Sequence, residues 1–344
     1  MDSVTQLLLG AAVGEAVLGR KVGHKAIAWG AVCGTLPDLD VFVPLGDAVR
    51  DFTYHRGPSH SLFVLAALTP LIVWLIRKLH PGAAAHRTGW YALVYLVFAT
   101  HVLLDSFTVY GTQIFWPLVT TPMTWSTIFI IDPAYTVPLL LGVTAALAAR
   151  RQGWGYRANA AGLALSSLYL AWSLGAKLYV EDVARDALAT RGIDAERLLT
   201  TPTPFNTVLW RAVAVAADGD YYEGYYSLFD RGAPIQWQQH DSAPELLAGI
   251  ADEWAVQRLQ WFTKGFYRVG REGDAIVITD LRMGLEPDYA FSFKVGEISN
   301  PHAVALQPPQ RVRSQRPMQA VRWVWGRIWQ PEPSAWAVVR SGMG

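Results

Sequence analysis

The sequence predicts an α-helical, polytopic membrane domain followed by a smaller α+β extramembrane domain. Hydrophobic residues form 52% of the 344-residue chain and charged residues only 17%, a balance that is typical of membrane proteins. Up to about Val180 the chain is a series of apolar runs broken by short loops. From Glu181 onward charges recur every few residues, and no run is long enough to span a bilayer. We therefore expect two domains, 1–180 and 181–344.

The first domain is predicted to contain five or six apolar helical segments. The first two are short, and Gly10, Gly14 and Gly19 would let another helix pack closely against the first. The later ones approach the roughly 20 residues that a spanning helix needs. The N-terminus lacks the basic start and cleavage site of a signal peptide, so we expect the first segment to stay in the mature protein. The segments are 4–18, 26–36, 61–79, 90–107, 127–149 and 158–180.

The second domain is predicted to combine one helix with several strands. Residues 181–199 have Ala-rich and charged faces and are expected to form the helix. Apolar and polar residues alternate over 208–228 around an Ala-Asp-Gly-Asp turn, which predicts a β-hairpin. Strand-like composition at 254–269 and 275–279, separated by a Gly-Arg-Glu-Gly turn, predicts two more strands. The tail 307–317, which contains Pro and Arg, is expected to be a loop.

The basic residues predict how the first domain crosses the membrane, because Lys and Arg in short loops mark the cytoplasmic side. Loops 19–25, 77–88 and 149–157 hold nine of them, whereas loops 38–60 and 108–126 hold two. These two sets of loops alternate along the chain. We therefore expect a multi-pass protein of the inner membrane, with the second domain on the external, periplasmic side. The formal net charge of +1 argues against a nucleic-acid surface, which needs a basic patch.

One apolar segment carries an imidazole and a carboxylate. His101 and Asp105 are four residues apart, so on a helix their side chains share one face and can bind a single cation. Ionisable groups within a membrane-length segment are costly and point to a function. The alternative is a His–Asp pair that only ties this helix to a neighbour.

Further residues suited to metal binding lie at the predicted external ends of other segments. Imidazole and carboxylate suit zinc, our first choice, and also manganese or iron, whereas the single cysteine, Cys33, excludes a Cys-based site. Six such side chains are about what two ions sharing a carboxylate would take. The alternatives are a solvated loop or helix cap for the two loop aspartates, and interfacial hydrogen bonding for two of the histidines. The candidate metal ligands are Asp38, Asp40, His55, His60, His101 and Asp105.

Two further roles are needed beside a catalytic metal. An unligated carboxylate, Asp40 or Asp132, is the candidate general base. Asp132 precedes Pro133, so it can instead cap a helix. Arg56 is the candidate substrate-binding residue for an anionic group, and its alternative is a side chain that snorkels to the interface.

The motifs of the first 140 residues form a recognisable set. They are Met1-Asp-Ser-Val-Thr-Gln6, Gly34-Thr-Leu-Pro-Asp-Leu-Asp40, His55-Arg-Gly-Pro-Ser-His60 and His101-Val-Leu-Leu-Asp105, followed by Tyr110-Gly-Thr-Gln113. The set resembles the membrane-bound metal-dependent hydrolase family typified by YdjM and YbcI, also described as LexA-binding and inner-membrane-associated. Pro202-Thr-Pro-Phe-Asn206, Trp261-Phe-Thr-Lys-Gly265 and Asp280-Leu-Arg-Met-Gly284 resemble the long members, which carry an extra C-terminal domain. Many relatives have His where this chain has Gln6; if that His is a ligand, one coordination position is altered here.

The resemblance and the candidate ligands together imply a metal-dependent hydrolase in a lipid bilayer. A metal-activated water would attack an ester or phosphoester, with an amphiphilic, lipid-like molecule as the expected substrate. One alternative is a membrane transporter in which the same acids and histidines relay protons or ions. Another is a non-catalytic binding protein with a structural metal. A closed shell of protein ligands would favour the structural metal, and an open coordination position the hydrolase.

Overall fold

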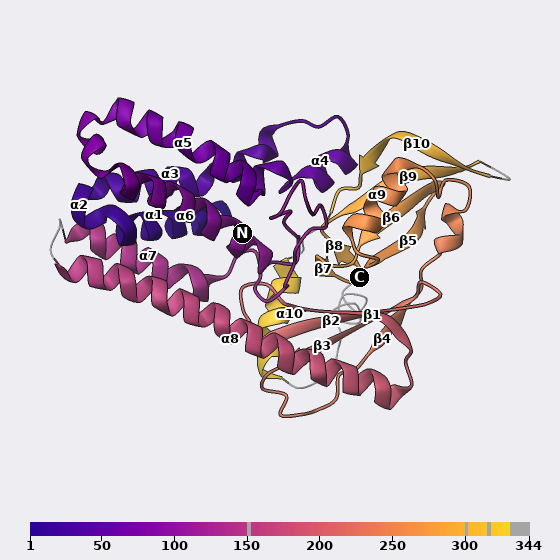
Figure 1. Cartoon of the computed structure of the whole chain (residues 1–344). Coiled ribbons are helices and arrows are strands. Elements are labelled where there is room, and N and C mark those ends of the chain that lie inside the picture. Colours follow the sequence, from indigo (N-terminus) through magenta and orange to yellow (C-terminus); the bar gives the residue numbers. More distant parts are fainter. Residues whose placement is uncertain (150–152, 300–301, 315–317, 331–344) are drawn as a thin grey trace. The chain divides into compact units, whose positions relative to one another are not determined.

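The chain folds into two compact units (Figure 1). The computed structural model describes residues 1–149, 153–299, 302–314 and 318–330. The first unit comprises residues 1–43 and 54–174, and the second comprises 44–53 and the chain from 175 onward. The predicted border near residue 180 lies inside one continuous helix, α8 (Gly153–Arg191).

The first unit begins with two short helices in close contact, α1 (Ser3–Gly14) and α3 (His24–Thr35). A Cβ atom on Gly10 would lie 2.3 Å from the carbonyl oxygen of Gly30, and one on Gly14 would lie 2.3 Å from that of Ala26. The close packing expected at Gly10 and Gly14 is therefore confirmed. Gly19 differs, because it ends a π-helical turn (Glu15–Gly19) where a Cβ would meet the Glu15 side chain of its own helix.

Three helices of the described residues are long and apolar enough to cross a membrane: α5 (Leu62–Leu79), α6 (Arg87–Ser106) and α8. The apolar helix α7 (Pro133–Ala148) has 16 residues. Helices α1 and α3 have 12 residues each, which at about 1.5 Å per residue is shorter than a bilayer core of about 30 Å. Three of the predicted segments thus reach spanning length, and a multi-pass topology stays a prediction.

Helix α6 lies at the centre of the first unit and packs against α1, α3 and α5. Its buried residues include Trp90, Leu93, Val97 and Phe98, which belong to one hydrophobic core with the other helices. Two short helices, η2 (Pro37–Phe42) and η3 (Pro58–His60), lie near the end of α6. Between them in the sequence, α4 (Ala48–Tyr54) belongs almost entirely to the second unit.

The second unit contains two four-stranded antiparallel sheets, with strand orders β1-β2-β3-β4 and β10-β9-β6-β5. The first sheet comprises β1 (Ala195–Pro202), β2 (Leu209–Ala216), β3 (Tyr221–Ser227) and β4 (Gln238–His240). The second comprises β5 (Tyr267–Glu272), β6 (Ala275–Asp280), β9 (Ser292–Ser299) and β10 (His302–Arg311). The other elements are β7 (Gly284–Leu285), β8 (Asp288–Tyr289), η5 (Pro244–Leu247), α9 (Trp254–Phe262) and α10 (Met318–Trp329). The predicted hairpin over 208–228 is confirmed as β2 and β3.

Three sequence predictions for this unit are wrong in part. Trp254–Phe262 is a helix, because Val256, Leu259 and Phe262 recur at helical spacing and are all buried. The helix expected to reach residue 199 ends at Arg191, where Gly192 takes a φ of +66° that favours glycine, and β1 follows. The predicted loop 307–317 belongs to β10 as far as Arg311, and its last residues, 315–317, lie outside the described part of the chain.

Candidate metal centre

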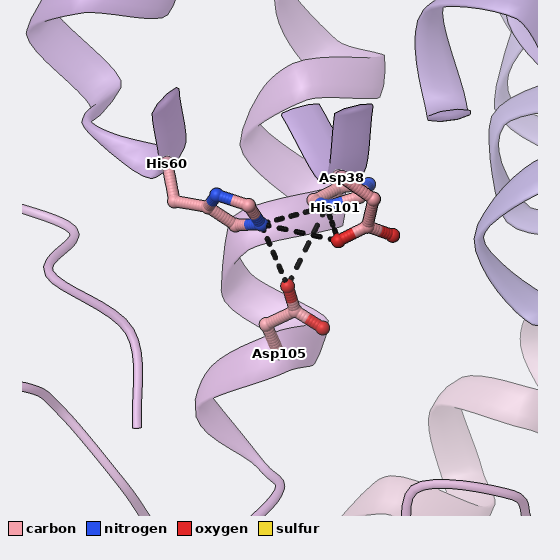
Figure 2. A group of neighbouring side chains, drawn as sticks. All are labelled: Asp38, His60, His101 and Asp105. Carbon is pink, nitrogen blue, oxygen red and sulfur yellow. Dashed lines mark hydrogen bonds and ion pairs between the residues drawn. The ribbon is translucent and has the colours of Figure 1, made fainter. Parts of the chain in front are cut away.

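Four of the six predicted ligands converge on one point in the first unit (Figure 2). Asp38 comes from η2, His60 from the end of η3, and His101 and Asp105 from successive turns of α6. One ligand atom from each residue lies within 4.8 Å of the other three. His60, His101 and Asp105 are buried and Asp38 is half-buried, so the cluster is shielded from water.

Five of the six distances between these ligand atoms are close to those of a tetrahedral metal site. His60 Nε2 lies 3.3 Å from His101 Nε2, 3.3 Å from Asp38 Oδ1 and 3.2 Å from Asp105 Oδ2. His101 Nε2 lies 3.6 Å from Asp38 Oδ1 and 3.4 Å from Asp105 Oδ2. Metal–ligand bonds of about 2.0–2.1 Å in a tetrahedron place ligand atoms roughly 3.3–3.4 Å apart. Two nitrogens and two oxygens at this spacing can hold a metal ion.

The hydrogen bonds of the outer imidazole nitrogens show where the histidine protons lie. His101 Nδ1 is 2.8 Å from the carbonyl oxygen of Gly34, and since a carbonyl only accepts, Nδ1 carries the proton. Ser59 Oγ donates to Asp40 Oδ2 at 2.6 Å, which leaves it to accept from His60 Nδ1 at 2.9 Å. In the neutral form of these imidazoles both Nε2 atoms present lone pairs to each other, an arrangement that a shared cation stabilises.

Asp40 and His55 form a second layer beside His60, outside the group of four. Asp40 Oδ1 is 2.8 Å from His55 Nδ1, and its Oδ2 accepts hydrogen bonds from Ser59 Oγ and from the backbone amide of Arg56. Burial opposes ionisation of Asp40, but these hydrogen bonds with His55 and Ser59 hold its pKa below the usual value. A direct metal role for Asp40 and His55 stays a prediction.

Gln6 contacts the ligand set from helix α1. Its Nε2 donates to Asp105 Oδ1 at 3.0 Å and to the carbonyl oxygen of His101 at 3.2 Å. The Gln6 side chain is fully buried. It binds Oδ1 of the Asp105 carboxylate, and Asp105 Oδ2 points toward the two histidines. Sequence reasoning identified Gln6 only as a departure from the family pattern. It missed the contact of Ser59 with His60, although Ser59 lies within the motif that was singled out.

Arg56 lies behind Asp105. Its Nη2 is 3.3 Å from Asp105 Oδ1, its Nη1 donates to Thr108 Oγ1 at 3.3 Å, and its guanidinium carbon is 5.3 Å from the centroid of the Tyr110 ring. The residue is buried and takes a φ of +61°, which is uncommon for a non-glycine residue. Its positive charge partly balances the ligand carboxylates. Binding of an anionic substrate group by Arg56 stays a prediction.

Asp132 takes the position of a helix cap. It is the N-cap of α7, where its Oδ1 accepts from the backbone amides of Ala134 and Tyr135 and its Oδ2 accepts from the hydroxyl of Tyr169. Both carboxylate oxygens are thus engaged within the helices of the first unit. A catalytic role for Asp132 stays a prediction.

The polar atoms of the cluster fit a divalent cation. Among the described residues, Asp105 Oδ2 and Asp38 Oδ2 are buried and accept no hydrogen bond, a costly state without a cation nearby. Two carboxylates and two imidazoles supply the oxygen and nitrogen donors that a divalent ion such as zinc, manganese or iron takes. Asp38, His60, His101 and Asp105 are therefore the residues that would hold a metal.

The comparisons with known proteins concern the first unit. Residues 1–180 match the model of the YdjM inner membrane protein family. These residues make up more than half of the chain. No curated protein and no solved structure matches the sequence.

Proposed function

Because the chain belongs to the YdjM inner membrane protein family and contains a group of four residues able to hold a metal, we propose that it is a membrane-bound metal-dependent hydrolase. A bound divalent ion would lower the pKa of a water molecule toward neutrality and polarise the scissile group. We propose zinc as the ion, with manganese or iron as alternatives. The approach of the two histidine Nε2 atoms to 3.3 Å is the observation that carries this proposal.

We assign proton transfer to Asp40. Its hydrogen bonds to His55 and Ser59 place it next to the ligand His60, and the side chain of His55 remains 22% exposed to solvent. A proton accepted in this layer can leave through His55, because its imidazole is hydrogen-bonded to Asp40 and partly exposed to solvent. Asp132 is the second candidate for the base, although both of its oxygens are already engaged at the start of α7.

We propose an amphiphilic ester or phosphoester as the substrate. The short helix η2 directs Asp38 toward the histidines, whereas its apolar residues Leu39, Val41 and Phe42 are exposed, Phe42 to 79%. Exposed apolar side chains beside a polar site suit a substrate that arrives from a bilayer. Arg56, 3.3 Å from Asp105 Oδ1, would provide the positive charge for an anionic headgroup.

One observation favours a second function, a non-catalytic protein with a structural metal. Four protein ligands at tetrahedral spacing fill the coordination shell of zinc, and closed shells are typical of structural sites. Catalysis then requires a fifth coordination position or displacement of one ligand. Asp38 is the ligand best able to move, because it is the only one of the four that is not fully buried.

Metal analysis and turnover assays on the full chain separate these functions. Wild type is expected to purify with about one equivalent of metal, because four ligands at tetrahedral spacing hold one ion. His101→Ala is expected to lose this metal. His24→Ala, which changes an exposed histidine, is expected to keep it. The metal-loaded protein is then incubated with lipid and water-soluble esters and phosphoesters. Metal-dependent turnover of lipid substrates supports the hydrolase. Turnover of soluble compounds alone would reject the lipid substrate, and stable metal without any turnover would favour the structural metal or a transporter.

A further inference from the structure

One face of helix α10 in the second unit is exposed and lies outside the hydrophobic core of the described residues. Met318, Arg322, Trp325 and Trp329 follow one another at helical spacings of four, three and four residues, so they share one face. All four are exposed, Met318 to 70% and Trp329 to 67%. Large apolar side chains, two of them tryptophans, therefore face away from the protein interior.

The opposite face of α10 fixes the helix to the sheet. Val324 and Ile328 are buried in a cluster with Leu209 of β2 and Tyr225 of β3. Arg327 forms a buried ion pair with Asp230, with Nη2 and Oδ2 2.7 Å apart. These contacts hold α10 in place, so the exposed tryptophans are not needed for its position.

A neighbouring loop extends the exposed stripe. The Phe229 ring stacks on Trp329 with centroids 5.1 Å apart and planes at 17°, and Phe229 and Arg231 are both exposed. Asp230, the only acidic residue within 227–233 and 318–330, is buried in its pair with Arg327. We call the resulting patch the aromatic–basic surface, made of Phe229, Arg231, Met318, Arg322, Trp325 and Trp329.

We propose that the aromatic–basic surface docks onto the headgroup region of an anionic lipid bilayer. Tryptophan is favoured at the membrane–water interface, where its ring is buried and its N–H stays near polar groups. Arg231 and Arg322 match lipid phosphates, and residues 227–233 and 318–330 contain no exposed carboxylate. The second unit is also continuous with a candidate span, because α8 supplies its residues 175–191. In the proposed membrane topology, α8 therefore tethers the second unit to a bilayer.

Site-specific labels on the full chain test this contact. Trp325→Cys and Trp329→Cys variants are labelled with an environment-sensitive fluorophore and reconstituted into vesicles that contain phosphatidylglycerol. Wild type serves as the labelling control, because its single cysteine, Cys33, is buried. Val304→Cys is the matched position, since Val304 is an exposed apolar residue of β10, 56% accessible and outside the surface.

We expect labels at 325 and 329 to be quenched by spin-labelled lipids and shielded from a water-soluble quencher, and the label at 304 to behave in the opposite way. Arg322→Gln combined with Arg231→Gln should weaken the lipid quenching in phosphatidylglycerol vesicles more than in phosphatidylcholine vesicles. Quenching from water at all three positions would overturn the proposal. Shielding from both quenchers would also overturn it, because protein would then cover the surface. Neither result depends on hydrolytic activity, so the outcome is independent of the proposed function.

Discussion

Hydrogen bonds orient the two histidines of the candidate centre. His101 and His60 are oriented by different partners, one a backbone carbonyl of α3 and the other the hydroxyl of Ser59. The sequence could predict the ligands because His and Asp at membrane-segment ends are rare and costly. It could not separate Asp38 from Asp40. Residues two apart on a 3₁₀ turn point in different directions, and only the fold shows which of them faces the histidines.

Ser59→Ala is expected to weaken metal binding without removing a ligand. The variant loses the acceptor for His60 Nδ1 and one hydrogen bond to Asp40, so the imidazole is no longer held with Nε2 toward the cluster. Loss of such an outer contact typically lowers metal affinity about 10–100-fold. The measurement is competition with a chromophoric chelator. Ser166→Ala is the control, because it removes a buried hydroxyl that donates a hydrogen bond to the carbonyl oxygen of Tyr135 in the same unit. An equal loss of metal affinity in this variant would contradict the specific role of Ser59.

The double variant Asp38→Ala/His101→Ala is expected to abolish binding at this centre and to lower stability only when metal is supplied. Binding to the native state alone stabilises it by about 4 kcal/mol at a thousandfold excess over Kd. Thermal unfolding of wild type should therefore shift upward with added zinc, and that of the double variant should not. Full metal occupancy in the double variant would refute the assignment of ligands.

Among the elements, those with a strong pattern were predictable from the sequence. The hairpin of β2 and β3 has strand-favouring residues on both sides of a turn sequence, and it formed as expected. Helix α9 was not predictable from composition, because Trp, Val and Phe are strand-favouring residues that here occur at helical spacing on a buried face. Tertiary packing decided its conformation. The same holds for residues 307–311 of β10, where Gln310 and Arg311 pair with β9 and the two prolines lie in an irregularity of the register between Ala305 and Gln310.

The contact between α1 and α3 connects helix packing to the metal centre. Gly10→Ala would place a methyl group 2.3 Å from the carbonyl oxygen of Gly30 and 2.9 Å from the Cα of Gly34, whose carbonyl orients His101. We expect the helices to separate, at a cost of about 1–3 kcal/mol for overpacking, and metal affinity to fall with stability. The unfolding midpoint in detergent and a metal titration measure both effects. Gly175→Ala in α8 is the control, because a Cβ there meets no atom within 4 Å, and it should be neutral or slightly stabilising.

At the scale of the whole molecule, the distribution of charge sets the expected orientation in the membrane. Loops 19–25, 77–88 and 149–157 hold nine Lys and Arg, against two in loops 38–60 and 108–126. Because basic loops stay in the cytoplasm, the loops that carry Asp38, Asp40, His55 and His60 should be external. Helix α8 begins within the basic stretch 149–157 and reaches the second unit, so that unit should be external too.

Cysteine accessibility in intact cells tests this orientation. Single cysteines are introduced in loop 77–88 and at the exposed position Val304 of the second unit, with the buried Cys33 giving the background. A membrane-impermeant maleimide applied from outside should label residue 304 once the outer membrane is permeabilised. It should label loop 77–88 only after the inner membrane is opened as well. The opposite pattern would place the second unit in the cytoplasm. The candidate metal centre would then face the cytoplasm as well, since its loops alternate with the basic ones, and any substrate would have to come from the inner leaflet.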